Sequence, residues 1–328
     1  MKTSEILSLV LIFCFSIFTI ELYAQAPNFI WTKRAGGVEG DYGHSIAVDS
    51  TGNSFIAGHF YGIVKFDTIT LTSTGGYDLF IAKYDSSGNV LWAKQVGGIG
   101  YVEGNSIVID KRGNSFITGY FDNSVAFETT ILNSYGGEDI FIAKYNPSGK
   151  ILWVKKVGGI ENDCGEEISI DGSGNLYLTG SFWGTANFDN VSLTSRNGSD
   201  TFAAKYDSLG NLIWVKQPSG IGSAVGKGIA TDKVGNSVVT GFFERTATFG
   251  TITLTSGSIH WPDFFIAKYD SAGNVLWAKQ AGGNYTVEGS DIAINESGES
   301  IVMGSFENTV TFGNTTFTTS GNKDIFIV

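Results

Sequence analysis

The segment Leu91-Trp-Ala-Lys-Gln-Val-Gly-Gly98 recurs as near-copies along the whole chain. Its tryptophan has equivalents at intervals of 61, 61, 61 and 63 residues, giving the series Trp31, Trp92, Trp153, Trp214 and Trp277. A fixed period of this size indicates one supersecondary unit that has been copied and stacked, because each copy buries its apolar surface against a neighbour. The sequence therefore predicts a repeat array.

Each copy contains strand-like runs and tight turns. In the copy that ends near Trp92, the runs 45–48, 54–57, 79–84 and 90–94 have alternating or β-branched apolar residues, and no run has helical periodicity. Two links share the formula Asp49-Ser-Thr-Gly-Asn53, in which aspartate caps a turn and glycine takes the left-handed conformation. A calcium loop would need several converging oxygen ligands, so a hairpin turn is favoured over a metal site.

These features predict an all-β fold, a β-propeller of five four-stranded blades of about 61 residues. The expected repeat units are 35–94, 95–155, 156–216, 217–279 and 280–328, the last completed by 27–34. Residues 28–33 resemble a fourth strand and residues 324–328 a third strand, so their pairing would close the ring and remove exposed edges. A truncated reading frame is the alternative explanation of these ends.

The N-terminus has the layout of a signal peptide at residues 1–24, with Lys2, an apolar run from 6 to 20 and a cut after Ala24. We expect residues 25–328 to form a single domain that is monomeric and without a transmembrane segment. The formal net charge of −11 argues against a nucleic-acid partner. Cys164 is the only cysteine outside the signal, and we expect it to pack rather than to catalyse.

Three motifs carry a resemblance to a known family: Trp-x-Lys-x-x-Gly-Gly, Gly-x-x-Asp-x-Phe-Ile-Ala-Lys-Tyr-Asp-x-x-Gly-Asn and Gly-x-Phe. Across residues 29–328 the chain resembles the bacterial SBBP-type β-propeller repeat. The resemblance implies a secreted protein, or one on the outer cell surface, of a Gram-negative bacterium, often with a C-terminal sorting or adhesive domain. It also implies seven blades, whereas this sequence has five copies and no sorting domain.

Candidate binding residues are those that differ between copies. One varied column follows an invariant glycine and is expected either to line a solvated channel rim or to contact a ligand at the channel mouth: His44, Asn105, Glu166, Lys227 and Ser290. Further candidates are ring-bearing side chains outside the repeated columns, for which loop packing is the alternative: His59, Tyr120, Trp183, His260 and Trp261.

The repeated columns are interpreted as structural. We expect the tryptophans and the phenylalanine column of Phe66 to form blade core, and Lys83 and Lys94 to point toward blade surfaces. The aspartate before each third strand is expected to cap loop amides: Asp78, Asp139, Asp200, Asp263 and Asp324.

Three functions fit the sequence. The first is a binding scaffold for a protein or glycan ligand on the face of the variable loops, without catalytic residues, cofactor or metal. The second is an extracellular carbohydrate-active hydrolase or lyase with acids at the channel mouth, the candidates being Glu39, Asp41, Glu103, Asp163, Glu166 and Glu288. The third is a structural spacer of a longer surface protein.

Overall fold

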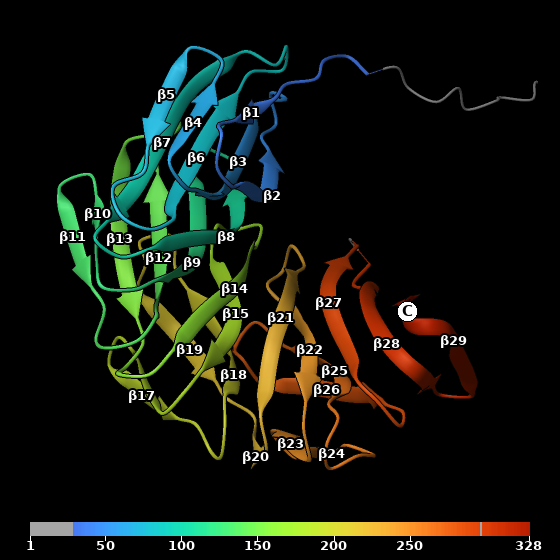
Figure 1. The fold of residues 1–328 in the computed structure, drawn as a ribbon. Helices are drawn as coiled ribbons and strands as arrows, with labels where there is room; N and C mark the ends of the chain where they lie inside the picture. The colour runs from blue at the N-terminus through green and yellow to red at the C-terminus, as the bar shows by residue number, and fades with distance from the viewer. Residues whose placement is uncertain (1–28, 296) are drawn as a thin grey trace, which may run out of the picture. The chain divides into compact units, whose positions relative to one another are not determined.

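A computed structural model describes residues 29–295 and 297–328 (Figure 1). Within these residues every regular element is a strand, which confirms the all-β prediction, and none forms a helix that is long and apolar enough to cross a membrane. Lys33–Val328 forms one compact unit. The signal peptide expected at 1–24 lies outside the described residues, so it stays a prediction.

Each copy forms a meander of antiparallel strands in the expected order, from an inner strand to an outer one. The inner strands are β2 (Asp41–Val48), β8 (Val102–Ile109), β14 (Asp163–Ile170), β21 (Ala224–Thr231) and β27 (Val287–Ile294). The second strands are β3 (Ser54–Phe60), β9 (Ser115–Phe121), β15 (Leu176–Phe182), β22 (Ser237–Phe243) and β28 (Ser300–Phe312). The third strands are β6 (Asp78–Tyr84), β12 (Asp139–Tyr145), β18 (Asp200–Tyr206), β25 (Asp263–Tyr269) and β29 (Thr315–Ile327). The outer strands are β7 (Val90–Gly98), β13 (Ile151–Val157), β19 (Leu212–Lys216) and β26 (Val275–Ala281).

The short links between these strands are hairpin turns, as predicted. Asp49 Oδ1 accepts hydrogen bonds from the amides of Thr51 and Asn53 at 2.9 and 3.0 Å, and Gly52 has φ of +83°. The same amide bonds recur in the turns that begin at Asp85, Asp110, Asn146, Asp171, Asp207, Asp232, Asp270 and Asn295. The aspartate or asparagine oxygen thus fixes the turn, and the left-handed glycine completes it.

A hairpin between the second and third strands adds to the four predicted runs of each copy. Four such hairpins are separate pairs: β4 (Ile63–Phe66) with β5 (Ile69–Thr72), β10 (Ser124–Phe127) with β11 (Thr130–Asn133), β16 (Thr185–Phe188) with β17 (Val191–Thr194), and β23 (Thr246–Phe249) with β24 (Ile252–Thr255). In the last copy the hairpin is continuous with β28 and β29.

The first strand of each hairpin also pairs with the residues that precede the inner strand of its own copy; at β16 and in the last copy this pairing is a single bridge, Gly158 with Asn187 and Gly282 with Thr311. In the clearest case β10 pairs with the end of β7, where Gly97 lies opposite Ala126, so that one six-stranded sheet joins two copies. The short strands β1 (Ala35–Gly36) and β20 (Ser219–Ile221) pair with β4 and β23 in the same way. The prediction of four strands per copy therefore described the central meander but missed this addition.

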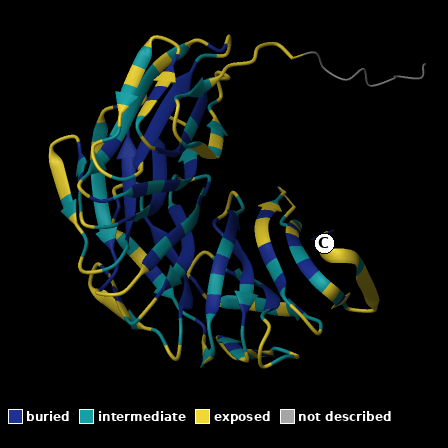
Figure 2. Cartoon of the chain, viewed as in Figure 1, coloured by how far each residue is buried: buried dark blue, intermediate teal, exposed yellow. Residues whose placement is uncertain are grey.

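The core lies between successive sheets. All seven residues of β6, β12 and β18 are buried, as the continuous blue of the central strands shows (Figure 2). The phenylalanine column is core as predicted: Phe66, Phe127 and Phe188 are fully buried and Phe249 nearly so, whereas Phe312 is only half-buried. On the inner side, residues from all five inner strands line one cavity of about 400 Å³.

Four of the repeated tryptophans pack in or against the core at the seam between copies: Trp214 is buried, and Trp92, Trp153 and Trp277 are partly buried. Trp92 is half-buried, and its Nε1 donates to the backbone oxygen of Pro147, 3.1 Å away in the next copy. Trp214 Nε1 donates in the same way to the backbone oxygen of Ser271 at 3.2 Å. The indole therefore packs each outer strand against the third-to-fourth turn of the next copy.

The column of Lys83 is also buried at this seam, which corrects the expectation that it points to a blade surface. Lys144 has its ammonium 4.7 Å from the centre of the Phe116 ring, and it donates to the backbone oxygen of Ser208 in the next copy at 2.9 Å. Burial lowers the pKa of Lys144, but the ring and the carbonyl replace part of its hydration.

Closure of the ring is not confirmed. Among the described residues, 29–34 form no strand, and β29 pairs only with β28. The first paired residues are Ala35 and Gly36, which join β4.

Candidate functional site

The varied column occupies a β-bulge in every copy. In β2, Gly43 lies opposite Gly58 and Ser45 opposite Ala57, so His44 is the extra residue. The same register shift flanks Asn105, Glu166, Lys227 and Ser290. A bulge redirects a side chain without disturbing the rest of the strand, which explains why this position tolerates five different residues.

Four of the residues predicted to bind a ligand meet in two pairs. His44 Nε2 lies 2.9 Å from His59 Nδ1, with the donor set by the tautomers, and Lys227 Nζ donates to Glu166 Oε1 at 2.5 Å. Asn105 donates to a backbone oxygen of the next copy at 3.0 Å. The Asn105 bond joins the second copy to the third, and the Lys227–Glu166 pair joins the third copy to the fourth, whereas the two histidines belong to the same copy.

Four other predicted residues lie elsewhere: Ser290 in β27, Trp183 after β15, and His260 and Trp261 in one loop. Ser290 is exposed at its bulge, and Trp183 is 50% exposed after β15. His260 and Trp261 lie in the inserted loop before β25, where the Trp261 ring is 5.6 Å from the ring of Tyr285. The structure therefore does not gather these side chains around the two pairs.

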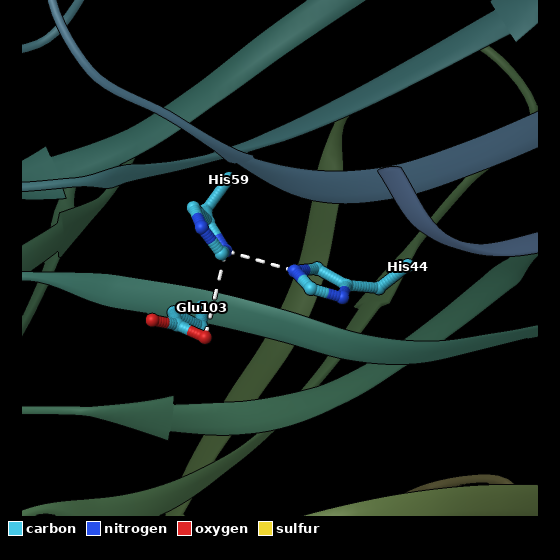
Figure 3. A group of neighbouring side chains, drawn as sticks. All are labelled: His44, His59 and Glu103. Carbon is cyan, nitrogen blue, oxygen red and sulfur yellow. Dashed lines mark hydrogen bonds and ion pairs between the residues drawn. The ribbon is translucent and has the colours of Figure 1, made fainter. Parts of the chain in front are cut away.

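The densest group of functional side chains is His44, His59 and Glu103, which come from β2, β3 and β8 (Figure 3). Glu103 Oε2 lies 3.5 Å from His59 Nδ1, and the three donor atoms all lie within 4.8 Å of one another. His59 is buried, Glu103 is half-buried and His44 is exposed, so the group opens to solvent on the His44 side. It joins the first copy to the second.

Tyrosine rings surround this group. The rings of Tyr42 and Tyr77 each lie 4.9 Å from the His59 ring, and Tyr61 lies 5.7 Å from Tyr77. Tyr42 is 50% exposed, Tyr61 45% and Tyr77 37%. We call these three rings the tyrosine patch. They hold the His59 ring in place and present aromatic surface to solvent.

The acid of the group lies opposite a tyrosine. Tyr120, a predicted site residue, is the cross-strand partner of Glu103, and burial raises the pKa of Tyr120, with Glu103 acting in the same direction. Tyr101 donates to Glu138 in the same region, and burial raises its pKa as well. Burial lowers the pKa of His59, with His44 acting in the same direction and Glu103 opposing. Near neutral pH burial therefore favours the neutral form of His59.

The acids considered for catalysis have other partners. Asp41 and Asp163 each accept a loop amide at 2.7 Å, and burial raises the pKa of Asp163 to about 7. Glu288 forms an ion pair with Lys323 at 3.2 Å. These side chains therefore act as loop caps or ion-pair members, and the expected capping by the column of Asp78 is confirmed, since its Oδ2 accepts the amide of Thr74 at 3.0 Å.

Cys164 is a half-buried free thiol. Burial and the neighbouring Glu166 raise its pKa well above the ordinary value. A raised pKa disfavours the thiolate, so the side chain is unsuited to nucleophilic chemistry.

Sequence reasoning named His44 and His59 but did not place Glu103, Tyr42 and Tyr77 with them. A signal was present: Tyr42 pairs with His59 across β2 and β3, and Glu103 pairs with Tyr120 in the same register. The column that holds Tyr42 and Glu103 faces the column that holds His59 and Tyr120, and both vary between copies. Once the strand register is known, this variation predicts which side chains lie together.

This fold and this site define an all-β propeller-repeat protein whose copies carry varied side chains at one edge. The chain carries SBBP beta-propeller repeats: the family model described as a beta-propeller repeat matches residues 30–59 and 91–120. Each matched segment runs from just before the tryptophan into the second strand, so the first segment includes His44 and His59 and the second includes Glu103. The resemblance found in the sequence is thereby confirmed at these segments.

Two curated proteins are similar over longer stretches. An uncharacterized WD repeat-containing protein of Acanthamoeba polyphaga mimivirus is 25% identical over 80% of this chain and 24% of its own length. The regulatory protein FlaEY of Caulobacter vibrioides is 25% identical over 46% of this chain and 17% of its own length. The chain thus spans a quarter or less of these relatives.

Similarity to solved structures is weaker. A protein of unknown function from Bacteroides caccae has a TM-score of 0.33 at 12% identity, covering 74% of this chain and 82% of that chain. A gluconolactonase from Xanthomonas campestris has a TM-score of 0.36 at 8% identity, covering 81% of this chain and 83% of that chain.

Proposed function

We propose that the protein is a binding scaffold that holds a glycan at the tyrosine patch. The observation that carries this proposal is the gathering of three partly exposed rings, Tyr42, Tyr61 and Tyr77, around His59 and beside the carboxylate of Glu103. Aromatic rings offer flat apolar surface at low entropic cost, and tyrosine adds a polar hydroxyl. A sugar presents the complementary pattern of apolar ring faces and hydroxyl donors.

The test is a glycan array probed with the purified full chain, followed by affinity measurement for the best ligand. Tyr42→Ala should weaken binding by about 5-fold or more, the loss typical of a side chain that anchors an interface. Trp183→Ala is the matched control, because it removes an equally exposed aromatic side chain from another copy. Equal affinity of wild type and Tyr42→Ala would contradict the proposal, binding only to protein ligands would favour a protein partner, and release of shortened glycans would favour the hydrolase alternative.

We also propose that the copies close into a five-bladed ring, with residues 27–34 as the fourth strand of the last blade. Support comes from register: Gly36 lies opposite Lys65 just as Gly97 lies opposite Ala126, so the segment before Ala35 stands where an outer strand would end. Deletion of residues 25–34 should then lower the melting temperature and promote self-association through the unpaired edge of β29. A deletion variant that is as stable and as monomeric as wild type would contradict closure.

Export is proposed on the sequence of residues 1–24. Expression in a Gram-negative host should give a protein outside the cytoplasm that begins at Gln25, as checked by mass spectrometry of the intact chain. Retention of residues 1–24 would refute this.

A further inference from the structure

The group of His44, His59 and Glu103 has the composition and spacing of a transition-metal site. Two imidazole nitrogens and one carboxylate oxygen are the protein ligands that zinc commonly takes when one coordination position stays open. The closest donor pair is His44 Nε2 and His59 Nδ1 at 2.9 Å, and Glu103 Oε2 is 3.5 Å from the same Nδ1. Tetrahedral zinc ligands with bonds of about 2.0 Å lie about 3.3 Å apart. These two distances lie on either side of that value, and all three donor atoms lie within 4.8 Å of one another, so a small rotation of the exposed His44 side chain would complete the set.

The surroundings fix the ligands in orientation. The rings of Tyr42 and Tyr77 pack against His59, and Glu103 lies opposite Tyr120 in the pairing of β8 with β9. Partners of this kind hold metal ligands in place in zinc sites. The ligands also come from three strands in the sheets of two copies, which are rigid elements rather than loops.

The donor set occurs at one seam of the array. The equivalent positions at the later seams do not repeat two histidines and an acid: they are Asn105, Tyr120 and Cys164, then Glu166, Ser181 and Val225, then Lys227, Phe242 and Glu288. A site made by these residues would therefore bind a single ion per chain.

We propose that His44, His59 and Glu103 bind one Zn²⁺ through His44 Nε2, His59 Nδ1 and Glu103 Oε2, with the fourth position open on the exposed His44 side. The ion takes the place of the hydrogen between the two rings, the donating imidazole moves its proton to its other ring nitrogen, and the carboxylate offsets part of the charge of the ion. The open position takes water or an oxygen atom of a ligand. The site needs no glycan, so it stands independently of the function proposed above.

Zinc binding is tested by competition with a chromogenic chelator, using the purified full chain near neutral pH. Wild type should bind one equivalent of Zn²⁺. His44→Ala and Glu103→Gln should each lower the affinity by at least about 100-fold, since loss even of an outer partner costs about 10- to 100-fold. His260→Ala is the matched control, because His260 is the third and last histidine of the chain and lies in the inserted loop. It should bind zinc as wild type does.

Folding is checked with the same samples. His44 is exposed and Glu103→Gln is isosteric, so circular dichroism should show both variants folded. Zinc at about 100 times its dissociation constant should raise the melting temperature of wild type and His260→Ala by about 5 °C, but not that of the two ligand variants. Absence of binding by wild type at micromolar zinc, or unchanged affinity in His44→Ala and Glu103→Gln, would overturn the proposal.

Discussion

Replacement of Glu167 with glutamine should make the protein more stable at alkaline pH and leave it nearly unchanged at acidic pH. Glu167 follows the bulge in β14 and lines the cavity between the inner strands. One of its carboxyl oxygens accepts the backbone N–H of Ile229 in the next copy, at 2.5 Å. Burial raises the pKa of Glu167 to about 8 despite this bond, and the nearby Asp291 raises it further. Glutamine keeps an acceptor oxygen but carries no ionisable proton.

The raised pKa of Glu167 decides in which pH range this carboxyl lowers the stability of the fold. A carboxyl with a raised pKa in the folded state binds its proton more tightly there than in the unfolded chain. Its contribution to stability is therefore complete below about pH 4.5 and is lost as the pH rises through about 8. A tenfold difference in proton affinity between the folded and unfolded states corresponds to about 1.4 kcal/mol, which sets a ceiling of about 5 kcal/mol. Glu167 is only half-buried and faces the cavity, so solvent screening reduces the expected gain to about 2 kcal/mol.

The assay is urea denaturation and thermal melting of wild type and Glu167→Gln at pH values of about 5, 7 and 9, which span the two pKa values. A gain of about 2 kcal/mol at the highest pH corresponds to about 4 °C in melting temperature. Glu39→Gln is the control, because it makes the same chemical change at an exposed side chain. If the free energies of unfolding of wild type and Glu167→Gln change by the same amount between the lowest and highest pH, burial does not raise the pKa of Glu167 in the folded protein.

Three packing predictions accompany it. Phe188→Ala should lower the free energy of unfolding by about 3–5 kcal/mol, because the ring is fully buried; a urea midpoint close to that of wild type would speak against this. Gly149→Ala should lower the free energy of unfolding by about 1–3 kcal/mol more than Gly52→Ala. Both glycines have positive φ, but only at Gly149 would the new methyl lie 2.9 Å from an indole, that of Trp92. Equal melting temperatures of the two variants would refute that contact. Trp214→Phe should cost about 1–3 kcal/mol through the lost hydrogen bond to Ser271 and lost packing; unchanged thermal melting would show that the seam tolerates its loss.

The sequence predicted the meander and its turns well because their signals are local and repeated. Asp49 with Gly52 defines a turn by its own hydrogen bonds, and the recurrence of this pattern leaves little ambiguity about where strands end. The added hairpin was missed because its tight turn lacks a repeated glycine: Asp67, Glu128 and Asp189 take the positive φ there. Its pairing with the residues that precede the inner strand is a long-range contact, which no local pattern encodes.

The site was only partly predictable for the same reason. His44 and His59 were identified because they differ from their equivalents, but their contact depends on the bulge that redirects His44. Glu103 comes from another copy, so its place beside His59 depends on how two sheets pack. Lys144 was assigned to the surface by alternation, yet the next copy covers that face and buries it.

The six-stranded sheet that β10 and β11 share with the first copy makes the unit of folding longer than the unit of duplication. A segment of one period that begins just after Gly98 would keep four meander strands but would leave β10 without the residues that it pairs with, Gly97 and Gly98. Gain or loss of whole periods, by contrast, leaves a strand end beside each hairpin. The number of copies can therefore change by recombination while the pairing between copies is kept.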